Sequence, residues 1–108
     1  MSLLDRKCED LKKGTPKLDA ARMKELGAEV PEWKANGDRL VRTFSFKDFD
    51  EAMTFVNRLA DVARAEDHHP DFTVRYSKVE VSTWTHTVNG LSDNDYILAA
   101  KLDRLYPR

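Results

Sequence analysis

The sequence contains little cysteine and no long apolar run. Cys8 is the single cysteine among 108 residues, so the chain cannot form an internal disulfide, which agrees with a reducing compartment. We interpret Cys8 as an ordinary small apolar residue and not as a catalytic thiol. No apolar run is long enough to cross a bilayer, and residues 1–11 mix charges among their leucines, unlike the apolar centre of a signal peptide. We therefore expect a cytoplasmic protein that makes no membrane contact.

An excess of charge of one sign is also missing. The 18 lysine and arginine residues are balanced by 19 aspartate and glutamate residues, which gives a formal net charge of −1. No broad basic field is available to attract nucleic acid or an anionic membrane, so we do not expect direct nucleic-acid binding. The length fits one domain with a modest core. We predict a leader over residues 1–17, where periodicity is weak, and a single domain over residues 18–108.

Apolar periodicity and turn signals predict three helices and two hairpins. A short helix begins after Asp19, which can cap it, and a last helix begins after Ser92. A long amphipathic helix begins after Asp48 and ends at or before His69, because Pro70 disfavours helical geometry at the preceding residue. Hairpins that are separated by helices predict an α+β domain with two layers, a four-stranded antiparallel sheet with helices packed on one face.

The second hairpin decides where the histidines lie. Residues 72–83 alternate between apolar and polar side chains on either side of a predicted two-residue loop at residues 77–78. Carried to the open end of the hairpin, this register places His69 opposite His86 on the polar face, with backbones about 5 Å apart. Two imidazoles in this arrangement could flank a small, flat ligand. A slip of one residue would move one of them to the other face.

Histidine is scarce as well, and all three copies, His68, His69 and His86, fall in this locality. Imidazole, with an unperturbed pKa of roughly 6.5, both gives and takes protons near neutrality, so the clustering indicates a site. Chance clustering of surface histidines is the alternative. Zinc bound by three imidazoles is another, but vicinal histidines diverge in extended chain and no helical pair at four-residue spacing is present. We predict no metal.

Several motifs around the histidines resemble one known family. Residues 66–72 (EDHHPDF), 76–79 (YSKV), 85–86 (TH) and 90–95 (GLSDND) are similar to the signature of the pterin-4a-carbinolamine dehydratases, also called 4a-hydroxytetrahydrobiopterin dehydratases. Trp33 also matches, and so does the stretch from Phe44 to Phe49. The resemblance implies a four-stranded antiparallel sheet with helices on one side, assembled as a homodimer or homotetramer.

The same resemblance implies a hydro-lyase that needs no cofactor. Its substrate would be a 4a-hydroxytetrahydropterin, which loses water to give the quinonoid dihydropterin in tetrahydrobiopterin recycling. Many relatives carry a glutamate four residues before the first histidine, where this chain has Arg64; Glu66 or Asp67 could substitute for it.

A protein-interaction module is the alternative function. Some animal members of the family act as a dimerisation cofactor and transcriptional coactivator through a helical surface. On the last helix of this chain, an apolar patch at Ile97, with Lys101 and Arg104 nearby, could form an oligomer face or a partner face.

Loss of water from a carbinolamine requires a proton for the departing hydroxyl and a proton removed from, or a lone pair donated by, the neighbouring ring nitrogen. Two groups that titrate near the working pH, one on each side of the ring, suit this task. Family resemblance makes His68, His69 and His86 the catalytic set. We predict that His69 and His86 are the acid–base pair and that His68 orients the substrate, because adjacent residues of an extended chain point to opposite sides.

Four more residues are candidates for substrate binding: Asp67, Trp84, Asp95 and Trp33. Asp95 stands at the family's acidic position and could fix a histidine tautomer or bind the pterin, or it could serve only as a helix-cap residue. Either tryptophan could stack on a pterin, and core packing is the other interpretation of each. Asp67 could accept a hydrogen bond from a histidine ring or lie in solvent at a helix end.

Overall fold

The helices and strands follow one another in the order that the sequence predicts. The computed structural model describes residues 2–106, so the outermost ends of the predicted leader and domain, residue 1 and residues 107–108, lie outside the described residues. The elements are η1 (Leu3–Asp5), α1 (Ala20–Gly27), β1 (Lys34–Asn36), β2 (Arg39–Ser45), α2 (Phe49–Glu66), β3 (Asp71–Arg75), β4 (Lys78–Thr83), η2 (His86–Val88) and α3 (Asp93–Leu105), where η1 and η2 are single 3₁₀ turns. No helix in this part of the chain is long and apolar enough to cross a membrane.

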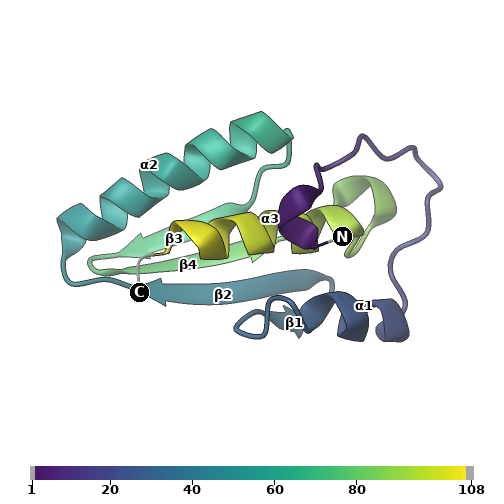
Figure 1. Ribbon diagram of the computed structural model, residues 1–108, viewed down its shortest axis with the longest axis horizontal. Coiled ribbons are helices and arrows are strands. Elements are labelled where there is room, and N and C mark those ends of the chain that lie inside the picture. The colour runs from purple at the N-terminus through teal and green to yellow at the C-terminus, as the bar shows by residue number, and fades with distance from the viewer. Residues whose placement is uncertain (1, 107–108) are drawn as a thin grey trace.

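The four strands form one antiparallel sheet in the order β1-β2-β4-β3. The side chains of Val79, Val81 and Thr83 on β4 are fully buried, whereas the residues between them are at least partly exposed. Figure 1 shows α2 and α3 on one side of the strands, which is the side that the buried residues face. The predicted α+β, two-layer fold with helices on one face is therefore confirmed.

The helix boundaries come from local hydrogen bonds that the sequence signals. The Asp48 side chain accepts from the Glu51 amide at the start of α2, and Ser92 and Asp95 form a complete capping box at the start of α3. At the other end of α2, Asp67 takes a left-handed φ of 52° and ends the helix directly before His68. The prediction that α2 stops before the histidine pair is confirmed, and the histidines lie on a junction held at both ends.

The register of the second hairpin differs from the prediction by two residues. Val74 pairs with Val79, Asp71 pairs with Ser82, and the loop consists of Tyr76 and its neighbour at position 77. The loop can start one residue early because Tyr76 adopts a left-handed φ of 53°, which is uncommon for a residue other than glycine. A shift of two residues keeps every side chain on its predicted face.

The predicted pairing of His69 with His86 is therefore wrong. The strand pairing ends at Asp71 and Ser82, and its continuation would bring His69 opposite Trp84. His86 lies two residues further along, in η2. Both histidines still lie at the same end of the sheet, because β3 begins where its antiparallel neighbour β4 ends.

The N-terminal segment lies against the helical layer. Leu3 in η1 is 1% exposed, and η1 packs on α3 (Figure 1). Ile97 is fully buried in the same layer. The prediction of an apolar docking patch at Ile97 is therefore wrong, since η1, α1 and α2 all contact this helix.

Candidate active site

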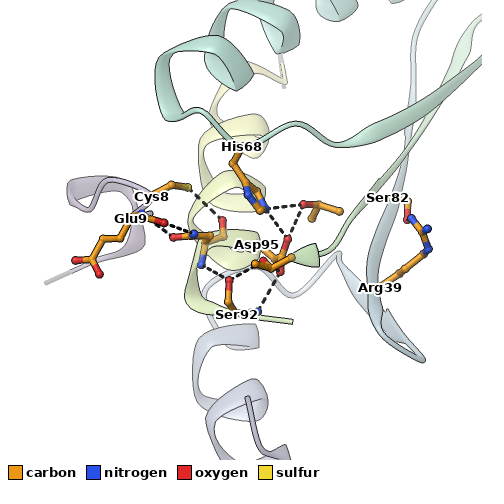
Figure 2. Close-up of polar contacts among 10 residues, drawn as sticks. Cys8, Glu9, Arg39, His68, Ser82, Ser92 and Asp95 are labelled. Carbon is orange, nitrogen blue, oxygen red and sulfur yellow. Dashed lines mark hydrogen bonds and ion pairs between the residues drawn. The ribbon is translucent and has the colours of Figure 1, made fainter. Parts of the chain in front are cut away.

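A buried carboxylate organises the histidine end of the sheet. Asp95, in the first turn of α3, is 0% exposed, and its Oδ1 lies 2.8 Å from His68 Nε2 and 2.6 Å from Thr83 Oγ1. Its Oδ2 accepts from Thr85 Oγ1 at 2.7 Å and from the Ser92 amide at 3.0 Å. Figure 2 shows the His68 ring pointing directly at Asp95. Four donors, from the loop after α2, the end of β4 and the segment between β4 and α3, therefore hold this carboxylate in one position.

The network determines how His68 can act. A carboxylate is a hydrogen-bond acceptor, so the contact is a bond from His68 Nε2–H to Asp95, and in a neutral ring Nδ1 is then the nitrogen that can accept a proton. The same Asp95 side chain completes the helix cap and contacts His68, and its role toward a ligand stays a prediction.

The two threonines of this network were not predicted from the sequence. Thr83 continues the inward alternation of the buried valines on β4, so it places a hydroxyl at a core position. Thr85 is 5% exposed and its hydroxyl contacts both Asp95 and Ser92. A polar residue at a predicted core position was the available signal, because buried hydroxyls almost always have a hydrogen-bond partner.

The other two histidines lie at the surface. His69 and His86 are exposed, and the His86 ring meets the half-buried Trp84 ring edge to face at a centroid distance of 5.5 Å. The Arg39 guanidinium lies 5.1 Å from the Trp84 ring centre and pairs with Asp71 at 2.8 Å. An exposed imidazole, an aromatic face and a cation thus lie next to each other, on the face of the sheet opposite to the buried side chains of Val79, Val81 and Thr83.

Trp33 is a core residue. It is 6% exposed, packs edge to face on Phe44 at 5.9 Å, and donates from Nε1 to Asp103 Oδ1 at 2.7 Å. Asp103 also accepts from Arg42 at 2.7 Å. Trp33 is therefore a core residue, as the other interpretation of it held. Trp84 is the tryptophan that lies beside a histidine, His86.

A pocket of about 280 Å³ opens between the loops that carry the histidines. One side is made by Asp67 and His68, another by Thr85 and Thr87 on either side of His86, and a third by residues 7–11. A larger hollow of about 740 Å³ is lined by Arg42, Asp103, Tyr106 and other residues, none of them histidine. The smaller pocket is therefore the one lined by a predicted catalytic residue, His68, whereas His69 and His86 are not among its lining residues.

Glu66 and Asp67, which could substitute for the glutamate that many relatives carry at the position of Arg64, differ in whether a ligand can reach them. Arg64 is exposed and pairs with Asp61 on the solvent side of α2. Glu66 is 8% exposed and bonds Lys101 Nζ at 2.6 Å and the Cys8 amide at 2.8 Å, so its oxygens are already occupied. Asp67 is exposed and lines the pocket, which makes it the carboxylate that a ligand can reach.

Cys8 does not have the properties of a reactive thiol. Burial, reinforced by the negative charge of Glu66, raises the pKa of the Cys8 thiol to about 12. The thiolate is the reactive form of cysteine, so the thiol is inert near neutrality. Within residues 2–106, no three histidine, cysteine or carboxylate side chains come together as a metal-binding group.

Three comparisons relate the chain to proteins of one kind. The sequence model of a family described as pterin 4 alpha carbinolamine dehydratase matches residues 16–105. A protein of Halorhodospira halophila is 43% identical over 97% of this chain and 98% of its own length, and one of Thermomicrobium roseum is 47% identical over 82% and 96%. Both carry the provisional name pterin-4-alpha-carbinolamine dehydratase.

The comparison with solved structures points the same way. A crystal structure from Brucella melitensis, described as transcriptional coactivator/pterin dehydratase, matches with a TM-score of 0.81 at 30% identity. The match covers 84% of this chain and 99% of the other.

Proposed function

The chain belongs to the pterin 4 alpha carbinolamine dehydratase family, and from that premise we propose that it removes water from a 4a-hydroxytetrahydropterin to give the quinonoid dihydropterin. The reaction breaks the bond between C4a and its hydroxyl oxygen. The hydroxyl leaves as water after it takes up a proton, and the adjacent ring nitrogen supplies its lone pair and loses a proton. No electrons are transferred, so the residues need only move protons and hold the ring.

The contact between His68 and Asp95 is the observation that supports this proposal best. A fully buried carboxylate orients an imidazole that lines a pocket, within a network in which every hydroxyl has a partner. Such a fixed histidine is a positioned group for binding or proton transfer. His69 and His86, at the same end of the sheet, supply two more imidazoles within a short span.

We assign His69 and His86 as the acid–base pair and His68 as the residue that orients the substrate. The exposed rings can exchange protons with solvent after each turnover, whereas the His68 Nε2–H is committed to Asp95. Positioned proton transfer of this kind contributes typically ~10²- to 10⁴-fold in rate. The assignment does not depend on the two rings facing each other directly, since a planar bicyclic ring is wide enough to contact groups that are offset along the sheet.

Asp67 and Trp84 are the proposed substrate-binding residues beside this set. Asp67 can accept from the ring N–H and amino donors of a pterin, and Trp84 can stack on its face. Trp33 is left out of the proposed site because it is buried. We further propose that the reaction belongs to cytoplasmic pterin recycling and that the protein acts as a homodimer or homotetramer.

A direct assay tests the proposal. A synthetic 4a-hydroxytetrahydropterin is mixed with the purified protein in a stopped-flow instrument, and formation of the quinonoid product is followed against the spontaneous rate. We expect acceleration in proportion to protein concentration. A rate equal to that without protein would refute the proposed function. Metal analysis of the active protein belongs to the same experiment, because stoichiometric zinc whose removal abolishes activity would contradict a histidine acid–base mechanism.

A coactivator role is a second candidate, favoured by the description of the Brucella melitensis structure. It would use a surface and not the pocket. A His86→Ala variant that no longer dehydrates the pterin but still raises transcription with a partner protein would establish a separate role. Loss of both activities would link them to the same site.

A further inference from the structure

The third side of the histidine pocket is an unexpected feature of the fold. Residues 7–11, which we call the strap, run across the pocket as five consecutive lining residues. The strap lies outside the segment that the family model matches, residues 16–105. One wall of the pocket is therefore made by a part of the chain that carries none of the histidine motifs.

Several hydrogen bonds hold the strap, and those to its backbone are made at Cys8 and Glu9. The Asn94 side chain, on a residue that is 5% exposed, accepts from the Glu9 amide at 2.9 Å and donates to the Glu9 carbonyl at 2.7 Å. The Cys8 amide donates to Glu66 Oε1 at 2.8 Å. In Figure 2, Cys8 and Glu9 lie on one side of the His68 and Asp95 pair, and Arg39 lies on the other.

The fastening uses groups that belong to the elements of the site. Glu66 is the last residue of α2, two residues before His68, and Asn94 directly precedes Asp95 on α3. Lys101 completes the attachment at Glu66 by donating to Glu66 Oε2 at 2.6 Å. The strap is thus held at a fixed position relative to His68 and Asp95.

The bonds at Glu9 are made to its backbone, as in a strand pair, and so they specify where the strap runs. The pocket that results is lined mainly by polar residues, including Lys7, Asp67 and Thr87. Such a lining fits a ligand group that has hydroxyls and suits an apolar group less well.

We propose that the strap is the specificity-determining wall of the site, and that it holds the polar, hydroxylated substituent of the pterin while the ring reacts at the histidines. Asn94 lines the pocket as well, and in this proposal it is a positioning residue because both of its side-chain bonds are made to the strap. This inference rests on the proposed function for the identity of the ring. Beyond that function, the strap is the part of the chain that selects the hydroxylated substituent.

The experiment compares two substrates and three variants. The substrates are 4a-hydroxytetrahydropterins with either a dihydroxypropyl group or a methyl group on the pyrazine ring. Asn94→Ala removes both bonds to Glu9, Glu9→Pro removes only the amide donor and leaves α3 untouched, and Asn57→Ala is the control. Asn57 is an exposed asparagine on α2 whose amide bonds the Met53 carbonyl.

Asn94→Ala and Glu9→Pro should raise KM for the hydroxylated substrate by roughly tenfold, since about 1.4 kcal/mol is the scale of one or two hydrogen bonds. The KM for the methyl substrate and kcat for both should change by less than about twofold. Amide hydrogen exchange at residues 8–10 should become faster in the same variants. Asn57→Ala should behave as wild type.

Equal effects on both substrates, or no effect on either while hydrogen exchange shows a released strap, would overturn the inference. Binding of the two corresponding oxidised pterins, measured by fluorescence quenching, gives the same discrimination without turnover. If the wild type does not accelerate dehydration, the proposed function fails, but the ratio of the two binding constants still tests the strap. A ratio that the Asn94→Ala variant leaves unchanged would refute the strap's role independently.

Discussion

His68 Nε2 lies 2.8 Å from Asp95 Oδ1, and this contact joins the loop after α2 to the first turn of α3. The two residues come from segments that are separated by the whole second hairpin. The carboxylate is inaccessible to water and takes three further hydrogen bonds, so its geometry is set before any ligand arrives.

Replacing Asp95 with asparagine should damage both stability and activity. An amide has one acceptor oxygen where the carboxylate has two, so some of the four donors would face an NH₂ group. We expect a loss of about 2–4 kcal/mol in the free energy of unfolding, from unsatisfied buried groups. The value of kcat/KM should fall at least about tenfold, because His68 loses its fixed tautomer. Urea denaturation and the stopped-flow assay measure the two effects.

The matched control is Asp103→Asn on the same helix. Asp103 is also a hydrogen-bonded carboxylate. Its two side-chain donors, Trp33 and Arg42, are remote from the histidines. It should lower stability and leave kcat/KM of the folded protein unchanged. If Asp95→Asn lost stability but retained activity, Asp95 would be a helix cap and nothing more.

His69→Ala and His86→Ala should each reduce kcat by at least ~10²-fold and leave the fold intact. Both side chains are exposed, so their removal creates no cavity. The pH profile of kcat/KM should lose a different limb in each variant, which would identify the acid and the base. Thermal unfolding and light scattering provide the control: a variant that unfolds or changes its oligomer size would show that the histidine is structural.

The element order and the position of the histidines at one end of the sheet could be predicted because local interactions determine them. Asp48, Ser92 and Pro70 act on their own neighbours in the chain, so their signals can be read without knowing the tertiary structure. The same is true of the inward face of β4, whose alternation survives a register shift of two residues.

The two wrong predictions, the register of the second hairpin and a surface position for Ile97, concern features that tertiary contacts determine. The hairpin register depends on Tyr76 accepting an unfavourable φ, and the Phe46 amide, next to β2, holds the loop by donating to the Ser77 carbonyl at 2.8 Å. Ile97 was expected at a surface, but η1 covers the helix that carries it. Each outcome depends on a segment that is distant in the sequence and is invisible to local patterns.

The strap should loosen in acid through Glu66. Burial alone would raise the pKa of Glu66, but the hydrogen bonds from Lys101 and the Cys8 amide and the charges of Lys101 and Lys7 outweigh it, so the pKa lies below its usual value. A carboxylate with a lowered pKa stabilises the folded state fully above the unfolded pKa, and this stability disappears as pH falls through the folded pKa.

Glu66→Gln should therefore be less stable than wild type at pH 7. The difference should shrink as pH falls below the unfolded-state pKa of roughly 4.3 and should be lost as pH passes through the lower folded-state pKa of Glu66. Unfolding by urea at several pH values measures it, and hydrogen exchange at Cys8 locates it. Glu32→Gln, at an exposed glutamate, is the control and should match wild type throughout. A difference that is independent of pH would mean that the charge of Glu66 contributes nothing.

The two tryptophans should separate structure from binding. Trp33→Phe removes the Nε1 donor to Asp103 and part of a buried ring, so the free energy of unfolding should fall by about 1–3 kcal/mol. Its kcat/KM should stay within about twofold of wild type, because Asp103 keeps its bond to Arg42 and the ring is buried away from ligand.

Trp84→Ala removes the half-buried ring beside His86 and should have the opposite effect. KM should rise by about tenfold through lost stacking, while the free energy of unfolding should change by less than about 1 kcal/mol. Denaturation curves and steady-state kinetics on both variants decide the matter, and a larger KM change at Trp33 than at Trp84 would move the substrate to the other side of the sheet.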